Sequence, residues 1–419
     1  MPILGAVLDS LLQATNSASA AEPGRGATDG RPGLAIIANV MTPYRANLHS
    51  LVAAGIPELK LHTLVTHGAG DFDWAIATPP EVNATNFSAN GEHSLDNPLR
   101  RPVAEWRKAG RLIRYVKTHD VKAVIFCFYR YISYLRAMDY CYRARIPFWV
   151  QLDSNIRSEP HLSGLKSFAK RSLYSWWLKR ASGVLSMGAL GDQFFVKYGA
   201  DPQRLYRVPC WPDFDAFTRQ DDVALDRWQR KFGLDRCRRY LMFSGRLVPE
   251  KRVDLLIDAF AAISGERSDW DLLIVGDGPL NKELRRRVPE RLRSRVVWTG
   301  FIGGADNAVA FHAADVLVLP SDQEPWAVVV QEAMAAGLVV VASDIVGAAH
   351  ELVEDQISGR IFAAGNLQQL IQAIRDVTDP AAFTRYNQQS HEAMASYRKN
   401  VQPVREIRRA LREAGALSS

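Results

Sequence analysis

The stretch from Val316 to Ala342 constrains the fold of this 419-residue chain more than any other. It opens with a short apolar run, 316–319, that stops before a proline, as expected of a buried parallel strand. After a polar loop, residues 327–336 predict a helix that ends at Gly337. A second apolar run, 338–342, completes a strand–loop–helix–strand unit. Such a unit predicts a parallel α/β sheet, with the loop and helix N-terminus at the carboxyl edge where open α/β sheets bind ligands.

Two carboxylates flank the predicted helix, Glu324 just before it and Glu332 eight residues later. If both followed helical geometry, they would be about 80° apart around the axis and about 12 Å apart along it. One ligand would reach both only if it were as long as a nucleotide diphosphate-sugar. The alternative is structural, because Glu324 also favours a helix N-terminus and Glu332 also suits a solvated helix face.

Length and composition indicate an ordinary globular protein. A chain of 419 residues suffices for two or three domains with large cores, and its hydrophobic and charged fractions are 47% and 23%. The four cysteines are widely spaced and form no Cys-x-x-Cys pair, so we expect reduced core residues and no metal site. No run of 18 or more apolar residues occurs, which predicts no membrane-spanning helix.

The net charge of +7 is concentrated in one segment. Between Arg100 and Arg180 there are 18 Lys and Arg against 5 Asp and Glu. This excess predicts a face that meets something anionic, such as phospholipid, a pyrophosphate-linked substrate or nucleic acid. A solvated basic surface explains the charge equally well.

Residues 165–180 of this segment also carry large apolar side chains. A basic helix that bears tryptophan is typical of helices in a membrane interface. A core helix with a basic outer edge is the alternative. The apolar residues, interleaved with five basic ones, are Leu165, Phe168, Leu173, Trp176 and Trp177.

Strands alternate with helices from residue 33 to residue 212, which predicts a first doubly wound, Rossmann-like domain. The loop after its first strand carries Pro43, Tyr44 and Arg45. Asp153 directly follows a later strand and therefore also lies at the carboxyl edge of the predicted sheet. Residues 1–32, ahead of this domain, predict a flexible N-terminal extension.

A turn-rich segment, 208–217, predicts the linker to a second domain of the same kind at residues 213–391. Its first strand is followed by Gly245 and Arg246, and Lys251 lies near the start of the next helix. Backbone N–H groups, a helix dipole and two fixed cations predict an anion site without a metal. An accidental Arg and Lys near a helix start is the alternative. A basic helical region, 392–419, closes the chain and is expected to return to the first domain.

The central stretch resembles the family 4 retaining glycosyltransferases, which have the two-domain GT-B fold. The string EPWAVVVQEAMAAGLVVVASDIVGAAHELVEDQISGRIF contains Glu324, seven further residues and then Glu332-Ala-Met-Ala-Ala-Gly, as in the E-x7-E signature of that family. GRLVPEK at 245–251 and VGDGP at 275–279 are similar to two further motifs of the family. The chain departs from it at Trp326-Ala327, where the family commonly has Phe-Gly.

The resemblance implies an α/β protein of GT-B architecture, with two doubly wound Rossmann-like domains facing a central cleft. Arg246 and Lys251 would hold the donor diphosphate, Glu332 would accept hydrogen bonds from the ribose, and Glu324 would accept them from the sugar. The implied donor site consists of Gly245, Arg246, Lys251, Gly276, Asp277, Gly278, Phe301, Ile302, Glu324, Pro325, Trp326, Ala327, Val328, Val329 and Glu332.

On the acceptor side, the resemblance implies Pro43, Tyr44 and Arg45. Asp153 stands where the family often carries a histidine near the donor sugar, so it is expected either to bind a sugar hydroxyl or to cap a turn. The implied catalytic residues are Arg246, Lys251, Glu324 and Asp153.

The implied reaction is transfer of a hexosyl unit, with retention, from a UDP- or GDP-sugar to a glycan or lipid-linked acceptor. The Asp-Phe-Asp triplets at 71–73 and 213–215 have the D-x-D form that holds a divalent ion in a different glycosyltransferase fold. Neither triplet directly follows an apolar strand, so we expect no metal or other cofactor. We expect a cytoplasmic protein, or one peripheral on the inner face of the plasma membrane, that binds no nucleic acid. No Gly-x-Gly-x-x-Gly fingerprint follows a strand, which disfavours dinucleotide binding.

Two alternatives to a transferase stay open. One is another GT-B enzyme, such as a sugar-nucleotide epimerase or a disaccharide phosphorylase. The other is a non-catalytic subunit that binds a nucleotide-sugar.

Overall fold

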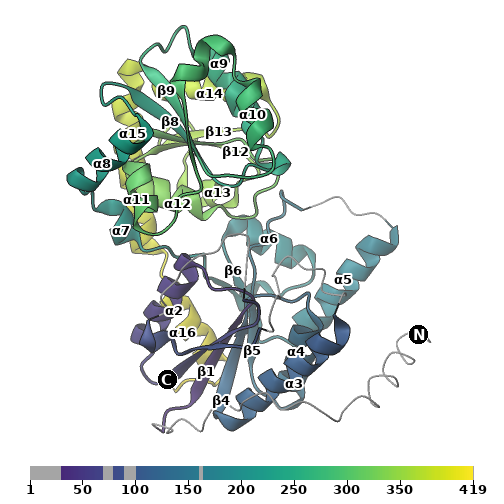
Figure 1. Cartoon of the computed structure of the whole chain (residues 1–419). Coiled ribbons are helices and arrows are strands. Elements are labelled where there is room, and N and C mark those ends of the chain that lie inside the picture. The colour runs from purple at the N-terminus through teal and green to yellow at the C-terminus, as the bar shows by residue number, and fades with distance from the viewer. Residues whose placement is uncertain (1–29, 69–78, 89–100, 160–163, 419) are drawn as a thin grey trace.

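The computed structural model describes residues 30–68, 79–88, 101–159 and 164–418 (Figure 1). The predicted extension at 1–32 lies almost wholly outside these residues, and the Asp-Phe-Asp triplet at 71–73 lies outside them entirely. No helix of the described ranges is long and apolar enough to cross a membrane.

The first domain is built on a seven-stranded parallel sheet with the strand order β3-β2-β1-β4-β5-β6-β7. Its chain winds outward from β1 in one direction and then, from β4 onward, in the other. Strand β1 pairs with β2 so that Leu34 lies opposite Leu61, and it pairs with β4 on its other side. The strands are β1 (Gly33–Ala38), β2 (Lys60–Val65), β3 (Ala84–Asn86), β4 (Val121–Phe126), β5 (Phe148–Gln151), β6 (Gly183–Ser186) and β7 (Leu205–Arg207).

Helices cover both faces of this sheet. Successive side chains of a strand point to opposite faces, so Ala35 and Ile37 of β1 enter one hydrophobic core while Leu34 and Ile36 enter another. In Figure 1, α3, α4 and α5 lie on one side of the sheet, and α2 and α16 lie on the other. The helices are α2 (Pro43–Gly55), α3 (Pro102–Thr118), α4 (Ile132–Arg143), α5 (Gly164–Leu178), α6 (Ala189–Lys197) and α16 (Pro403–Glu413), with short 3-10 turns η1 (Pro80–Val82) and η2 (Pro202–Arg204).

The second domain repeats the plan with a six-stranded parallel sheet in the order β10-β9-β8-β11-β12-β13. The two apolar runs of the central stretch form neighbouring strands, with Val316 opposite Val339. Apolar side chains of all six strands enter one continuous core. The strands are β8 (Arg239–Ser244), β9 (Trp270–Val275), β10 (Val296–Gly300), β11 (Val316–Leu319), β12 (Val339–Ser343) and β13 (Gly359–Phe362).

The helix of the central stretch, α12 (Val328–Ala335), is slightly shorter than the predicted 327–336. Glu324 therefore lies in the loop before it, and the separation that helical geometry gave for Glu324 and Glu332 does not apply. The other helices are α7 (Phe214–Thr218), α8 (Asp222–Phe232), α9 (Val253–Ile263), α10 (Asn281–Arg287), α11 (Ala305–His312), α13 (Gly347–Leu352), α14 (Leu367–Thr378) and α15 (Pro380–Asn400), with 3-10 turns η3 (Pro249–Lys251) and η4 (Glu290–Arg295).

The C-terminal region is two helices, not the single basic helical stretch expected over 392–419. Helix α15 still packs on the second domain, since Met394 and Tyr397 belong to its core. The chain then crosses over at Val401 and Gln402, and α16 buries Ile407 and Leu411 against the first domain. The return to the first domain thus begins about ten residues later than the sequence analysis placed it.

Candidate active site

Both sheets reverse their winding direction at one point, between β1 and β4 in the first domain and between β8 and β11 in the second. At such a switch point the loops leave the carboxyl edge in opposite directions and open a crevice, which is where open α/β sheets bind ligands. Of the residues expected to bind donor and acceptor, Tyr44 and Arg45 come after β1, Arg246 and Lys251 after β8, and Glu324 after β11.

Glycines shape the loops at the carboxyl edge of the second sheet. A Cβ on Gly276, whose φ is +132°, would lie 1.9 Å from the carbonyl oxygen of Gly245, and one on Gly278 would lie 2.6 Å from that of Leu247. The Leu247 amide also donates to the Asp277 carbonyl over 3.0 Å. Only glycine permits backbones to pass this closely, so the loops after β8 and β9 form one interlocked unit.

Asp277, expected in the donor site, stabilises the turn in which it lies. Its Oδ1 accepts hydrogen bonds from the Gly278 amide (2.7 Å) and from Nδ2 of Asn281 (2.9 Å). This carboxylate therefore stabilises the turn that brings the loop backbone to the edge of the sheet.

Lys251 and Glu324 come from different loops and form a direct ion pair. Neighbouring contacts hold the two loops together, since the Asp322 amide donates to the Glu250 carbonyl (2.8 Å) and Arg252 pairs with Asp322 (2.8 Å). The Lys251 and Glu324 side chains are 21% and 12% exposed, so the pair lies in a partly desolvated position where its charges act strongly. The structure thus brings together one cation and one acid of the five charged residues expected in the donor site.

Glu332 lies on α12 and is half-buried. Burial raises the pKa of its carboxyl group to about 7. Within the described part of the chain its carboxylate has no hydrogen-bond or ion-pair partner. A half-buried acid without a protein partner is suited to accept hydrogen bonds from a ligand.

The other residues expected around the donor have mixed surroundings. Arg246 and Ile302 are half-buried and Phe301 is exposed, each in a loop that follows a strand of the second sheet. Val328 and Val329 are half-buried in the first turn of α12.

Trp326 and Ala327 have structural roles in the second domain. The Trp326 side chain is buried, and its Nε1 donates to Oε1 of Gln331 over 3.0 Å. Gln331 in turn donates to the Cys210 carbonyl in the linker over 2.9 Å, so the indole helps to tie α12 to the segment that joins the two domains. Ala327 has a φ of +73°, a left-handed conformation that favours glycine.

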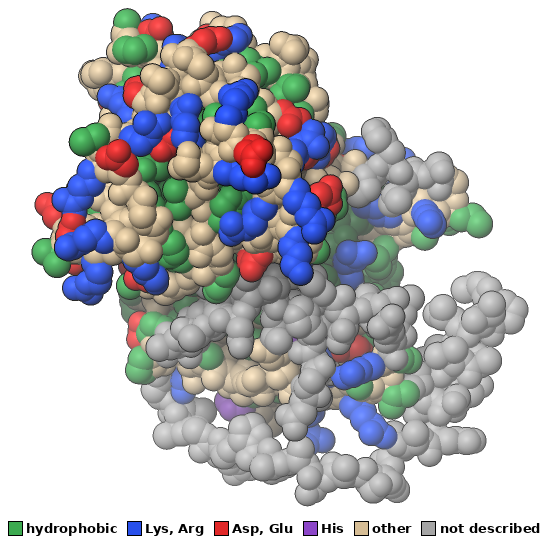
Figure 2. All heavy atoms as spheres, turned by 45° about the horizontal axis from the view of Figure 1, so that its top comes forward, with side chains coloured by type: hydrophobic (Ala, Val, Ile, Leu, Met, Phe, Trp, Pro, Cys, Tyr) green, Lys and Arg blue, Asp and Glu red, His purple; other side chains and the backbone are tan. Residues whose placement is uncertain are grey.

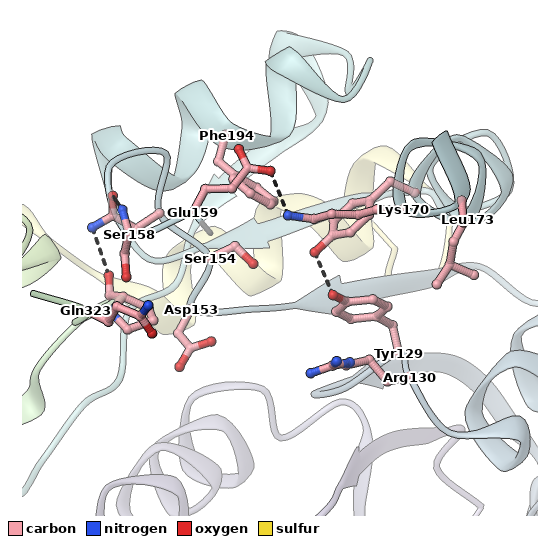
Figure 3. Close-up of a pocket in the computed structure, with 14 residues that line it drawn as sticks. Tyr129, Arg130, Asp153, Ser154, Ser158, Glu159, Lys170, Leu173, Phe194 and Gln323 are labelled. Carbon is pink, nitrogen blue, oxygen red and sulfur yellow. Dashed lines mark hydrogen bonds and ion pairs between the residues drawn. The ribbon is translucent and has the colours of Figure 1, made fainter. Parts of the chain in front are cut away.

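A cavity of about 690 Å³ opens in the first domain and reaches the second (Figure 3). Figure 3 shows the residues after β5 facing those after β4, with Lys170 and Leu173 of α5 at one side. Two residues of the loop after β11 close the cavity from the second domain, which makes it a site between the domains. It is lined by Tyr129, Arg130, Asp153, Ser154, Asn155, Ser158, Glu159, Ala169, Lys170, Leu173, Tyr174, Phe194, Gln323 and Pro325.

A smaller cavity, about 270 Å³, lies at the switch point of the first sheet and shares Tyr129, Arg130, Asp153 and Ser154 with the larger one. Tyr44 and Arg45, expected on the acceptor side, line this smaller cavity. Nη1 of Arg45 donates to Oδ1 of Asn39 (2.7 Å) and to the Val40 carbonyl (2.6 Å), which fixes the guanidinium. Pro43 is exposed and begins helix α2, where its ring suits the first turn.

Asp153 lies where the two cavities meet. Its side chain is exposed to them, yet the surrounding protein raises the pKa of the carboxyl by desolvation, while the charge of Arg45 opposes that rise. Of the two roles expected for Asp153, contact with a ligand fits this position better than capping of a turn.

Glu159, which the sequence analysis did not single out, organises one wall of the larger cavity. Its carboxylate pairs with Lys170 (2.6 Å) and Lys197 (2.8 Å) and accepts a hydrogen bond from Tyr198. Although burial raises the pKa of Glu159, these donors lower it to about 2. No local sequence signal identifies this cluster, because its members come from a loop and two separate helices.

Contacts between the domains were also absent from the sequence-based expectations. The Glu324 amide donates to Oγ of Ser158 (3.1 Å), and Nδ2 of Asn155 donates to the Ile345 carbonyl (2.9 Å). A Cβ on Gly347 would lie 2.2 Å from the Pro325 carbonyl oxygen, so glycine permits the close packing next to Asn155. These contacts place the loop that carries Glu324 directly beside the first-domain cavity.

The second Asp-Phe-Asp triplet has a structural role. Asp213 caps α7 by accepting from the amides of Asp215 and Ala216, and Asp215 pairs with Arg398 of α15 (2.8 Å). In the ranges that the structure covers, no cluster of three or more His, Cys, Asp or Glu could hold a metal ion.

Residues 238–379 match the family model of the glycosyl transferases group 1. Part of the chain is 27% identical over 241 residues to the alpha-D-kanosaminyltransferase of Streptomyces kanamyceticus, a match that covers 56% of this chain and 62% of that protein. Another part is 40% identical over 144 residues to a GDP-mannose-dependent alpha-mannosyltransferase of Mycolicibacterium smegmatis, covering 34% of this chain and 36% of that protein. The chain thus spans less than two thirds of the length of these curated relatives.

Solved structures resemble nearly the whole chain. HepE from Anabaena, in complex with UDP and glucose, superposes with a TM-score of 0.69 at 17% identity, covering 92% of this chain and all of that one. Sucrose-phosphate synthase from Thermosynechococcus elongatus superposes with a TM-score of 0.72, also at 17% identity, with the same coverage of 92% and 100%. The GT-B fold expected from the sequence is therefore confirmed.

Proposed function

We propose that this protein is a glycosyltransferase that moves a hexosyl unit from a UDP- or GDP-sugar to a glycan or lipid-linked acceptor. The observation that carries the proposal is the Lys251–Glu324 ion pair, at the carboxyl edge of the second sheet beside a cavity of the first domain. The match of residues 238–379 to the glycosyl transferases group 1 supports it. So do relatives whose names describe transfer of kanosaminyl and mannosyl units.

In this proposal the second domain holds the donor. Lys251 exchanges its partner Glu324 for the diphosphate, Arg246 supplies a second positive charge, and the interlocked glycine loops let the backbone approach the nucleotide. Glu332 accepts hydrogen bonds from the ribose hydroxyls, and Glu324, released from Lys251, accepts them from the sugar.

The first domain holds the acceptor in the cavity that Asp153 lines. The bond between the anomeric carbon and the β-phosphate oxygen breaks, and its electron pair stays on the diphosphate. The acceptor hydroxyl oxygen then bonds to the anomeric carbon from the same face and passes its proton to the leaving phosphate. Bond formation on the same face gives retention of the anomeric configuration, which is part of the proposal. Independence from a metal is also part of it, because two cations are available to stabilise the charge that grows on the leaving group.

The test is a transfer assay that follows release of nucleoside diphosphate from UDP-glucose and from GDP-mannose, with and without a crude glycolipid fraction. We expect Lys251→Ala and Arg246→Ala to lower turnover about 10²- to 10³-fold, the usual effect of removing one group that stabilises transition-state charge. Arg293→Ala is the matched control, because Arg293 is an exposed cation of the same domain, 61% accessible.

Both variants should stay folded at the assay temperature, since neither cation belongs to the core, although Lys251→Ala should lose some stability because the Glu324 carboxylate loses its ion-pair partner. Near-normal turnover of the two variants, or no release of nucleoside diphosphate by the wild type under any condition, would contradict the proposal. Nuclear magnetic resonance of the first-formed product then reports the anomeric configuration.

A further inference from the structure

The first half of helix α5 exposes two large apolar side chains. Leu165 and Phe168 are 87% and 72% exposed, the two highest values among the large hydrophobic residues of the described chain. Positions three apart lie on the same side of a helix, so the two form one apolar patch. In Figure 1, this end of α5 extends away from the body of the first domain.

The second half of α5 is a core helix. The two roles expected for residues 165–180, a membrane-interface helix and a core helix, therefore concern different halves of α5. Tyr174 and Trp177 are buried in the core of the first domain. Trp176 is half-buried, and the guanidinium of Arg180 lies 4.5 Å from its ring centre. Trp177 therefore belongs to the protein interior and Trp176 to its margin, and the exposed apolar surface lies about two to three turns nearer the start of the helix.

Cations surround the patch, and no acid balances them within the helix. Residues 164–180 contain Lys166, Lys170, Arg171, Lys179 and Arg180 and no Asp or Glu. Lys166 and Arg171 are exposed on either side of Phe168. Large apolar side chains flanked by cations are the chemistry of a helix that lies in the interface of an anionic bilayer.

The same helix leads into the larger cavity. Ala169, Lys170, Leu173 and Tyr174 line that cavity, and they begin directly after Phe168 in the helix. Glu159 fixes the orientation of α5 at this point, through its ion pair with Lys170. A bilayer that receives Leu165 and Phe168 would therefore lie within about 15 Å of the cavity wall, given a rise of about 1.5 Å per residue.

We propose that the segment Leu165–Arg171 docks on an anionic lipid surface and so presents an amphiphilic, lipid-linked acceptor to the first-domain cavity. The docking rests on the apolar pair and its flanking cations. The part that concerns the acceptor rests on the proposed function.

The experiment is co-flotation of the full chain with vesicles of equal parts phosphatidylglycerol and phosphatidylcholine, compared with phosphatidylcholine alone. We expect binding to the anionic vesicles, at least tenfold weaker binding by Leu165→Asp/Phe168→Asp, and weaker binding by Lys166→Glu/Arg171→Glu. Val223→Asp is the matched control, because Val223 is 69% exposed in the second domain and should not affect binding.

Equal binding by the wild type and Leu165→Asp/Phe168→Asp would overturn the proposal, as would no binding by either. A dimer in analytical ultracentrifugation that the same double substitution dissociates would also overturn it, since the patch would then meet a second copy of the chain. Thermal shift with UDP-glucose and GDP-mannose separates the two proposals. A wild type that binds vesicles but neither nucleotide-sugar keeps the docking and removes the proposed function, and the reverse result removes the docking alone.

Discussion

At the scale of single residues, the pairing of Lys251 with Glu324 means that each charge already has a partner before any ligand arrives. A diphosphate that binds Lys251 must displace the carboxylate. The sequence predicted that both residues belong to one site, but their direct contact depends on two loops from distant parts of the chain and could not be read from spacing. Ala327 adopts an αL backbone, a conformation that glycine would adopt with less strain.

We expect Glu324→Gln to bind UDP at least as tightly as the wild type while its turnover falls. The amide no longer competes for Lys251, yet it accepts hydrogen bonds from the sugar less strongly than a carboxylate. Isothermal titration calorimetry and the transfer assay measure the two effects separately. Weaker UDP binding by this variant would show that the carboxylate does not compete with the ligand.

The raised pKa of Glu332 predicts a pH-dependent affinity for the donor. Ribose hydroxyls donate to the ionised carboxylate, so binding should be fully present above a pH of about 7 and should weaken about tenfold for each unit below it. Titration of UDP by calorimetry between pH 5.5 and pH 8.5 measures this slope. Glu332→Gln should abolish the slope, whereas Glu290→Gln, at an 89% exposed side chain, should leave it unchanged.

The same pKa has a consequence for stability, with a definite sign. Burial favours the protonated form in the folded state, so the stability associated with Glu332 is present below its ordinary pKa of 4.5 and is lost as the pH rises through about 7. Glu332→Gln should therefore raise the unfolding temperature more at pH 8 than at pH 5. An equal change at both pH values would mean that the carboxyl titrates normally.

At the scale of elements, the two apolar runs of the central stretch, 316–319 and 338–342, predicted β11 and β12 to within one residue at each boundary, because parallel strands buried on both faces are almost continuously apolar. Strands β3 and β7, at the two edges of the first sheet, are three residues long and show no such apolar run. Pro403 does indicate the break between α15 and α16, because a proline disfavours the helical conformation of the residue before it.

The interlocked loops give a test at this scale. Gly276→Ala should destabilise the protein by about 2 to 4 kcal/mol, because the new Cβ meets the Gly245 carbonyl in a backbone conformation that L-residues avoid. Gly265→Ala is the matched control, since a Cβ there meets nothing within 4 Å. Urea denaturation measures both, and equal stability of the two variants would mean that the loops do not pack in this way.

At the scale of the whole molecule, the sequence predicted two Rossmann-like domains but not how they meet. Asn155, Ser158 and Glu351 are unremarkable in the sequence, yet they link the domains, with Oε1 of Glu351 accepting a hydrogen bond from the Ala189 amide over 2.6 Å. Their partners lie 160 to 190 residues away in the chain, so only the folded arrangement identifies them. The cavity shared by both domains depends on these contacts, which is why no local pattern indicated its walls.

Donor binding by the second domain is the central claim, and a thermal-shift panel of UDP- and GDP-sugars tests it most directly. A ligand at 100 times its dissociation constant adds about 2.7 kcal/mol to the free energy of unfolding. We expect at least one nucleotide-sugar to stabilise the wild type by this amount, and Lys251→Ala and Arg246→Ala to respond much less at the same concentration. No response to any member of the panel, or an equal response of the wild type and both variants, would contradict the claim.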